Sequence, residues 1–153
     1  MIIKLTKRSD IPPLQRVLQE TGLFPPEMLP DMTDGFLSTT DPNDLWLTCL
    51  QEEEPIGLCY AVPEALAEGT WNMLALAVLP IWQGKGCGAT IVQHLEEYLR
   101  AHDQRILIAD TSGTEGFAAT RAFYVRQGYE EEARIRDFWA PGDDKVTFRK
   151  ALL

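Results

Sequence analysis

The chain has 153 residues, of which 45% are hydrophobic and 24% are charged, with a formal net charge of −9. These values are ordinary for a soluble globular protein, and the length fits a single domain over residues 1–153. A surface this acidic disfavours nucleic-acid binding, which needs clustered positive charge, and it suits cationic partners such as amines. We therefore expect one domain without a nucleic-acid partner.

Other sequence features indicate the cellular setting. No apolar stretch approaches the roughly 20 residues of a membrane-spanning helix, since the longest apolar run covers only Met73–Leu79. The first residues turn polar too soon for a signal peptide. The three cysteines form no Cys-x-x-Cys pair, and an odd, unpaired set is typical of a reducing compartment. We expect a cytoplasmic protein with no membrane partner and no metal site.

The first part of the chain predicts one strand followed by two helices. Ile2–Leu5 has the composition of a short strand. Ser9 and Asp10 offer a helix N-cap, and Gly22 can end that helix in the left-handed conformation. The apolar residues within Met28–Leu37 indicate a second, irregular helix, because prolines interrupt the stretch that precedes it.

Three strands are expected next, in an antiparallel run. Leu45–Gln51 and Ile56–Val62 are apolar segments joined by a short, charged turn at Glu52–Pro55, as in a hairpin. Trp71–Val78 gives the third strand. An antiparallel run of this kind commonly packs one face on helices and on the core.

The second half of the chain returns to helices and strands in alternation. Apolar residues at helical spacing predict helices over Gly86–Arg100 and Phe117–Gln127, separated by a central strand at Arg105–Asp110. Two final strands, Glu132–Trp139 and Lys145–Lys150, form a hairpin. The sum is a mixed α/β (α+β) fold of about seven strands and about four helices.

A glycine-rich turn at Gln83–Ala89 carries the strongest functional signal. It has the sequence Gln-Gly-Lys-Gly-Cys-Gly-Ala and leads from the strand that ends near Pro80 directly into a helix. The start of a helix presents unpaired N–H groups and the positive end of its dipole, and glycines allow a ligand to approach the backbone. The turn therefore predicts a binding site for a phosphate or pyrophosphate, to which Lys85 could add a charge.

The turn is also compatible with a dinucleotide-binding fingerprint, Gly84-x-Gly86-x-x-Ala89, in which Asp110 would be the acidic residue that binds the ribose. This alternative is disfavoured because the turn follows an antiparallel run and leaves room for only about one more strand–helix step. A phosphate loop of the Walker type needs Gly-Lys-Ser or Gly-Lys-Thr, which does not follow here.

Two motifs in order resemble those of the GNAT superfamily of N-acetyltransferases. Gln83–Gly88 resembles its cofactor motif, which is Gln or Arg, two residues, Gly, one residue, and Gly or Ala. About 40 residues on, the predicted helix that contains Tyr124 ends with Gly128 and Tyr129, as the family's helix of Tyr, three residues, Gly and an aromatic does. The resemblance extends to the order of elements over nearly the whole chain.

The resemblance implies a mainly antiparallel sheet, splayed between strands four and five, that binds acetyl-CoA as cofactor. The backbone of the fourth strand would pair with the pantetheine arm, and the glycine turn would surround the pyrophosphate. Phe117 stands where many relatives have a cofactor-binding Asn, so Thr120 or Arg121 would take over part of that contact. The residues assigned to cofactor binding are Leu76, Ala77, Val78, Gln83, Gly84, Lys85, Gly86, Cys87, Gly88, Ala89 and Thr120.

The implied reaction is acetyl transfer from acetyl-CoA to a primary amine of a small molecule, peptide or protein, by direct attack of the amine in a ternary complex. A phenol with a pKa of about 10 is protonated at neutral pH, so Tyr124 can donate a proton to the leaving thiolate. Asp110 is the candidate base, directly or through water, because it ends the central strand. Glu64 and Glu68 could line the amine site or form a solvated acidic loop.

Several residues are given structural interpretations instead. Cys87 lies in the turn, where a helix start lowers the pKa of a thiol, but we expect it to pack inward. His94 and His102 are expected at the surface. A non-catalytic acyl-CoA sensor on the same fold stays open as an alternative function. The amine acceptor stays unidentified, as does the oligomeric state, for which a homodimer is one option.

Overall fold

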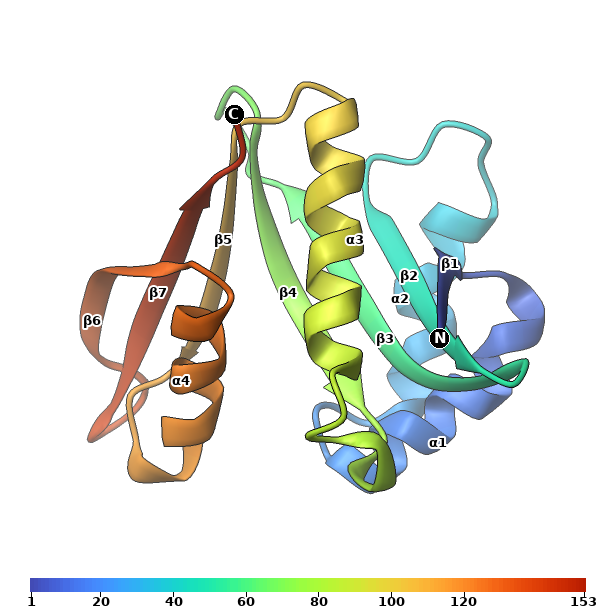
Figure 1. Ribbon diagram of the computed structural model, residues 1–153, viewed down its shortest axis with the longest axis horizontal. Helices are drawn as coiled ribbons and strands as arrows, with labels where there is room; N and C mark the ends of the chain where they lie inside the picture. The colour runs from blue at the N-terminus through green and yellow to red at the C-terminus, as the bar shows by residue number, and fades with distance from the viewer.

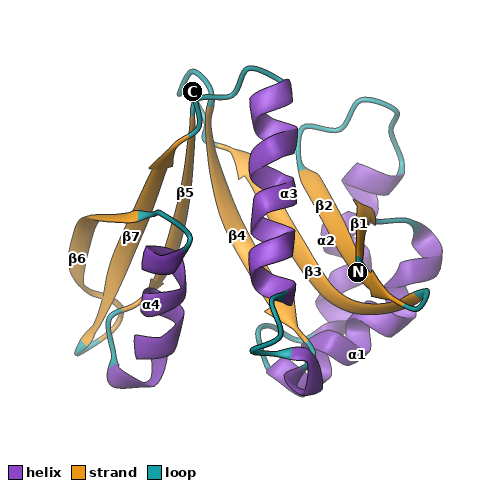
Figure 2. Ribbon diagram, viewed as in Figure 1, coloured by secondary structure: helices purple, strands orange, loops and turns teal.

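The computed structural model describes residues 1–153 and contains one seven-stranded sheet with helices on both faces (Figures 1 and 2). Short 3-10 turns precede several of the helices. The strands are β1 (Ile2–Leu5), β2 (Leu45–Gln51), β3 (Glu54–Pro63), β4 (Thr70–Val78), β5 (Ile106–Ser112), β6 (Glu130–Ala140) and β7 (Asp143–Ala151). The α-helices are α1 (Ile11–Thr21), α2 (Leu29–Leu37), α3 (Cys87–Ala101) and α4 (Ala118–Arg126).

The strand order is β1-β2-β3-β4-β5-β7-β6, and every neighbouring pair is antiparallel except β4 and β5. The parallel pair follows from chain direction, because α3 crosses over the sheet between these two strands. Helices α3 and α4 lie in front of the sheet in Figure 1, whereas α1 and α2 lie behind it. The predicted mixed fold of seven strands and four helices is confirmed.

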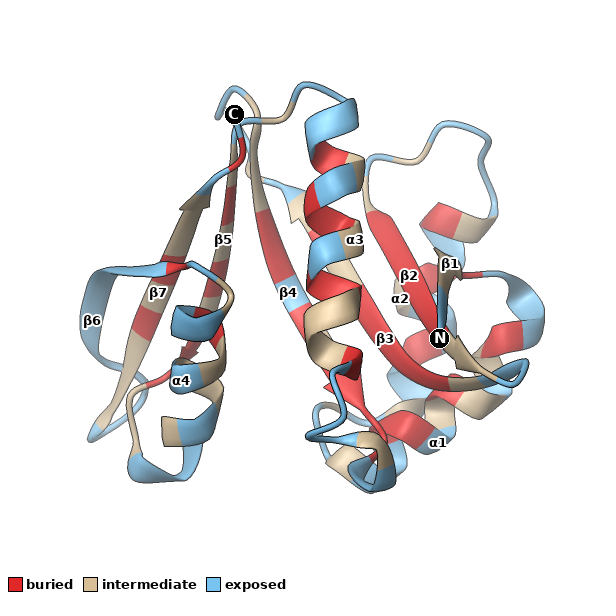
Figure 3. Ribbon diagram, in the orientation of Figure 1, coloured by how far each residue is buried: buried red, intermediate tan, exposed pale blue.

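Buried hydrophobic residues are concentrated around β2, β3 and the side of α3 that faces the sheet (Figure 3). The side chains at Ile91, Leu95 and Leu99 of α3 are fully or almost fully buried and recur at the spacing that places them on one helix face. Behind the sheet, Leu14 and Leu18 of α1 are buried in the same way. The two helix layers thus hold the first four strands as one rigid unit.

The sheet parts in its middle, and this opening positions the site. β4 pairs with β5 only over Thr70–Asn72, opposite Ile106–Ile108, and the two strands then diverge. A register shift between β3 and β4 leaves Leu74 unpaired as a β-bulge, a feature that bends a strand and increases its twist. The bulge lies just where β4 leaves β5. The predicted splay between strands four and five is confirmed.

Two local details differ from the sequence-based expectation. Asp10 stands at the predicted N-cap of α1, but its carboxylate makes no cap there; it pairs with Lys4 and accepts a hydrogen bond from the backbone N–H of Lys7. The preceding 3-10 turn supplies the local contacts that a cap would otherwise provide. In β6, pairing with β7 is interrupted between Ile135 and Ala140, so the strand is not the continuous hairpin arm that its pattern predicts.

Candidate active site

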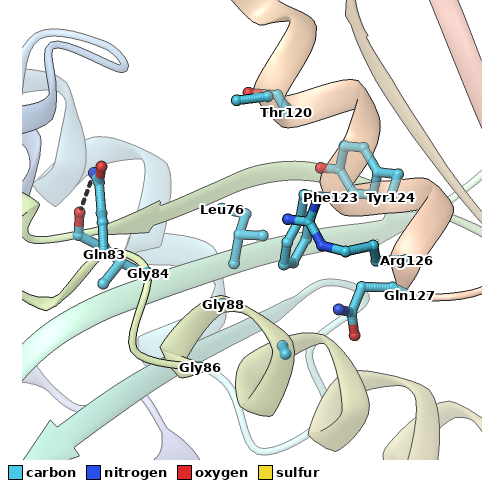
Figure 4. Close-up of a pocket in the computed structure, with 13 residues that line it drawn as sticks. Leu76, Gln83, Gly84, Gly86, Gly88, Thr120, Phe123, Tyr124, Arg126 and Gln127 are labelled. Carbon is cyan, nitrogen blue, oxygen red and sulfur yellow. Dashed lines mark hydrogen bonds between the residues drawn. The ribbon is translucent and has the colours of Figure 1, made fainter.

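A cavity of about 540 Å³ lies between the start of α3, the end of β4 and one side of α4 (Figure 4). β4 contributes the apolar side chains of Leu76 and Val78, and α4 contributes one wall. The glycine turn forms the opposite wall. The lining residues are Leu76, Val78, Gln83, Gly84, Gly86, Gly88, Ala89, Ala119, Thr120, Phe123, Tyr124, Arg126 and Gln127.

The glycine turn presents a row of free backbone donors. None of the N–H groups from Gly84 to Ala89 donates to another backbone group, whereas the next one, that of Thr90, bonds to the carbonyl of Gly86 at 3.0 Å. Gly84 and Gly86 have φ of 72° and 86°, a conformation that suits glycine. A Cβ atom at either position would meet nothing within 4 Å. The turn is therefore an open cradle of N–H groups at a helix start, which is the geometry that binds phosphates.

The edge of β4 that faces the opening offers further backbone groups. The N–H of Leu79 bonds to Ile56 of β3 at 2.8 Å, and backbone groups of successive residues point alternately to the two sides of a strand. Leu76 and Val78 therefore present their N–H groups to the opening, whereas the backbone of Ala77 faces β3. The carbonyl of Val78 accepts a hydrogen bond from the Gln83 side chain at 2.9 Å, drawn as a dashed line in Figure 4.

Tyr124 lies on the side of α4 that lines the cavity (Figure 4). Its ring is buried and packs on Phe148 of β7 at 5.4 Å between centroids and edge-on against Tyr129 at 5.7 Å. Burial raises the pKa of Tyr124 above its usual value of 10.0, and the nearby thiol of Cys59 and carboxylate of Asp110 act in the same direction. Packing thus fixes the position of the ring, and the raised pKa keeps the phenol protonated at neutral pH.

Asp110 lies on the other face of the sheet from Tyr124. It pairs with Thr147 across β5 and β7, while the adjacent pair of Ala109 and Phe148 faces α4; side chains of successive strand residues point to opposite faces. Its Oδ1 accepts from the Thr147 hydroxyl at 2.6 Å, and its Oδ2 accepts from Nδ2 of Asn72 at 3.3 Å. The carboxylate is therefore fixed at the point where β4 and β5 part.

The structure brings most of the predicted cofactor residues together but leaves three of them aside. Ala77, Lys85 and Cys87 do not line the cavity. The Lys85 ammonium lies over the Trp82 ring, 5.1 Å from its centroid. Cys87 is buried, and burial raises the pKa of its thiol, which leaves it an inward-packing residue. Arg121 is also occupied, because it donates to the carbonyls of Ser112 and Thr114.

Four cavity residues were not anticipated from the sequence: Ala119, Phe123, Arg126 and Gln127. They share one side of α4 with Thr120 and Tyr124, at the three- and four-residue spacing of a helix face. That spacing relative to Tyr124 was the signal that could have identified them. Arg126 has no ion-pair partner and gives this wall a free positive charge.

The remaining candidates lie elsewhere or act differently. Glu64 accepts a hydrogen bond from Nδ2 of Asn72 at 3.0 Å, which places it beside Asp110. Glu68 is exposed. His102 stacks on Tyr98 at the far end of α3, and His94 is partly buried outside the cavity. No helix has the length and apolar character needed to cross a membrane.

Comparison with known proteins agrees with this architecture. The acetyltransferase (GNAT) family matches residues 12–129, most of the chain, and the chain therefore belongs to that family. A comparison with curated protein sequences gave no match.

Solved structures give the same fold along nearly the whole chain. A protein of Desulfovibrio desulfuricans assigned to the GNAT acetyltransferases is 28% identical, with a TM-score of 0.89 over 99% of each chain. An aminoglycoside 6'-N-acetyltransferase complexed with coenzyme A has a TM-score of 0.82 at 15% identity, covering 100% of this chain and 98% of its own. The ribosomal-protein-S18-alanine N-acetyltransferase of Escherichia coli has a TM-score of 0.79 at 17% identity, over 99% and 93% of the two chains.

Proposed function

We propose that this protein transfers an acetyl group from acetyl-CoA to a primary amine of a small molecule or peptide, by direct attack in a ternary complex. The observation that carries the proposal is the cavity that joins free N–H groups at the start of α3 to the buried phenol of Tyr124. The carboxylate of Asp110 lies across the splay. In this proposal a phosphate cradle, a proton donor and a proton acceptor would surround one opening in the sheet.

The residues present fit acetyl-CoA. The cradle from Gly84 to Ala89 is open and rich in donors, which suits a diphosphate, and Arg126 would add a charge at the same cavity. The unpaired edge of β4 at Leu76 and Val78 can bond to the amide groups of an extended arm. When bound, acetyl-CoA would supply a thioester whose carbonyl is the target of the amine.

The chain's own groups would then manage charge and protons. Asp110 would accept a proton from the acceptor's ammonium, directly or through water, which leaves a neutral nucleophile. The N–H of Val78 would stabilise negative charge as it develops on the carbonyl oxygen. Tyr124 would give its proton to the thiolate as the C–S bond breaks. The nitrogen would lose its second proton to solvent as the amide forms, Asp110 would release the first proton to solvent, and solvent would reprotonate Tyr124.

A two-stage experiment tests this function. Calorimetry with acetyl-CoA is expected to show binding at micromolar concentration, and release of free thiol is expected in the presence of an accepted amine. The amine panel should contain amino acids, diamines and polyamines, aminoglycosides and peptide N-termini. Absence of binding would refute the proposal, whereas binding without thiol release across the panel would favour a non-catalytic acyl-CoA sensor.

We also propose a cytoplasmic location, supported by three cysteines that are all buried and free, as in proteins of reducing compartments. A homodimer is a further proposal, which sedimentation of the purified protein can test. The exposed edge strand β6 is the natural surface for such contact, because its whole length is solvent-accessible. A monomer at every concentration would remove it.

A further inference from the structure

An internal lysine occupies a cation site on the Asp110 side of the sheet. The Nζ atom of Lys145 lies 4.2 Å from the centroid of the Phe138 ring and 4.0 Å from Oδ2 of Asp110. An aromatic face and a carboxylate on two sides of one ammonium are the two groups that bind organic cations in proteins. The carboxylate contact is at the upper limit of an ion pair, and the Lys145 side chain is 20% exposed.

Specific backbone and side-chain contacts hold the aromatic residues of this site in place. The interruption of β6 carries Phe138 and Trp139, and both rings are about half exposed, at 48% and 49%. Asp137 turns the chain here with φ of 54°, and its N–H bonds to Asp144 at 3.0 Å. The indole N–H of Trp139 reaches the carbonyl of Thr111, next to Asp110, at 3.3 Å. The part of β6 that does not pair with β7 thereby places Phe138 and Trp139 beside the end of β5.

The other wall holds an incompletely satisfied polar group. The Asn72 amide donates to both Asp110 and Glu64, so two carboxylates gather around it. Asn72 is only 7% exposed, yet its Oδ1 has no hydrogen-bond partner. A buried acceptor without a donor is costly, and this one belongs to the amide whose Nδ2 donates to Asp110. Lys145 is the only cation within ion-pair distance of Asp110, and Glu64 has no ion-pair partner.

This site lies where an acceptor must approach. Asp110, Thr147 and Lys145 alternate along paired strands and therefore share the face opposite Tyr124. The β4–β5 opening begins at Asn72, beside Asp110. An amine seated at the Lys145 position would thus enter the opening from one face, while the cofactor cavity opens on the other.

We propose that Phe138 and Asp110 bind the ammonium group of the acceptor. Lys145 occupies this position until the acceptor displaces it. The acceptor is an unbranched alkylamine such as a diamine or a lysine side chain. The proposal rests on the proposed function and specifies its substrate class. The substrate class follows from the group that now occupies the site. A site that accommodates the ammonium of Lys145 on its unbranched methylene chain also accommodates an ammonium on an unbranched ligand. The net charge of −9 favours such cations further.

The test uses 1,5-diaminopentane as acceptor in the thiol-release assay and compares Lys145→Gln with the unmodified protein. Removing the internal competitor is expected to lower the KM for the diamine by roughly threefold to tenfold, the value of one weak ion pair and one cation–π contact. The KM for acetyl-CoA should not change. Lys7→Gln is the matched control, since it removes the same charge from an exposed position and should leave both constants unchanged.

A second pair of variants separates displacement from a general charge effect. Phe138→Leu alone is expected to change the diamine KM little, because it weakens the hold on Lys145 and on the acceptor together. In the Lys145→Gln background, the same substitution should raise the diamine KM about threefold. Equal effects of Phe138→Leu in both backgrounds would overturn the proposal, as would an unchanged or higher KM in Lys145→Gln.

Failure here is distinguishable from failure of the proposed function. If no amine in the panel releases thiol, the transferase function falls, and calorimetric titration of the diamine into the coenzyme A complex still reads the ammonium site. Tighter binding to Lys145→Gln than to the unmodified protein would support the site on its own. If thiol is released only with amino sugars or peptide N-termini, the function stands and the alkylamine site is wrong.

Discussion

The hydroxyl of Tyr124 combines two properties that rarely coincide, because it lines a cavity although its ring is buried among Phe123, Tyr129 and Phe148. Burial disfavours the phenolate, so the raised pKa of Tyr124 keeps the proton in place well into alkaline solution. The three aromatic contacts fix the position of the ring and thus of the phenol oxygen. A phenol that stays protonated and is held in one place suits the proposed role as proton donor to the leaving thiolate.

Tyr124→Phe is therefore expected to lower kcat by about a hundredfold or more, the usual contribution of a positioned proton donor. The KM for acetyl-CoA should change less than about threefold, because the ring and its packing remain. Steady-state thiol release measures both. Tyr98→Phe is the control, since it removes a phenol from the far end of α3, and unchanged kcat in Tyr124→Phe would exclude the role as acid.

The sequence could predict site residues whose role depends on their chemical type at a fixed spacing. It could not predict residues that come together only because of how the strands pair. Tyr124 and the glycine turn were identifiable because their chemistry needs a phenol and glycines at fixed spacing. The grouping of Asp110 with Phe138 and Lys145 depends on a break in the pairing of β6 with β7. No local pattern specifies where a strand slips its register, so only the fold could reveal that cation site.

Among the elements, the turn before α3 and the helix itself form a single device. A left-handed φ at Gly84 and Gly86 directs consecutive N–H groups outward, and the helix dipole adds to their field. Gly88 contributes in another way: a Cβ atom there would lie 3.3 Å from the Phe123 ring, so glycine allows α3 and α4 to approach. The width of the cavity between them is set at that contact.

Gly84→Ala or Gly86→Ala should weaken acetyl-CoA binding by about tenfold, since a left-handed alanine costs roughly 1–2 kcal/mol and the turn relaxes away from that conformation. Clashes with other residues play no part, because the space around both Cβ positions is empty. Calorimetry measures the affinity. Gly116→Ala is the matched control: it also meets nothing within 4 Å and has no positive φ, so a loss of affinity there would contradict the reasoning.

A buried ionic cluster joins α3 to the C-terminal part of the sheet. Glu96 of α3 is almost fully buried; it accepts from the Tyr129 hydroxyl at 2.8 Å and from Lys150 of β7 at 2.9 Å. Lys150 also donates to the carbonyl of Gln127 at 2.7 Å, a residue of the cavity wall. Because β4 and β5 pair over only a few residues, this cluster adds to the hydrophobic core that runs through both halves of the sheet.

Lys150→Met is expected to lower the free energy of unfolding by about 2–3 kcal/mol, because it leaves the buried Glu96 carboxylate with the Tyr129 hydroxyl and only the longer ion-pair contact to Arg100. Urea unfolding followed by circular dichroism measures the change. Arg16→Met provides the comparison, since it removes an exposed pair with Glu20 and should cost less than about 1 kcal/mol. Equal losses in the two variants would argue against a special role for the cluster.

On the scale of the whole molecule, the order of elements, their approximate bounds and the central splay were all predictable. Periodicity identifies the helices, and the family resemblance supplies the sheet. What the pattern did not supply is how weakly the two halves adhere: β4 and β5 share only three paired positions. Long-range pairing of that kind depends on the bulge at Leu74, and nothing in its neighbourhood of the sequence marks it.

A ligand that contacts both halves should therefore stabilise the entire protein. Coenzyme A at about a hundred times its Kd is expected to add about 2.7 kcal/mol, which for a domain of this size raises the Tm by roughly 5–10 °C. Thermal melting followed by fluorescence is sufficient. NAD at equal concentration is the control. A rise in Tm with NAD but not with coenzyme A would favour the alternative that the glycine turn binds a dinucleotide.

The divergence of β4 from β5 gives the molecule two sheet edges in its interior. Free edges normally attract other chains and lead to aggregation, but here α3 and α4 stand over the gap and meet at Gly88 and Phe123. Only a slender, extended molecule with amide groups along its length can take the place of the missing strand. The opening thus selects ligands by their width and their hydrogen-bonding pattern before they reach any reacting group. Short extended peptides are therefore expected to compete with the cofactor for the opening.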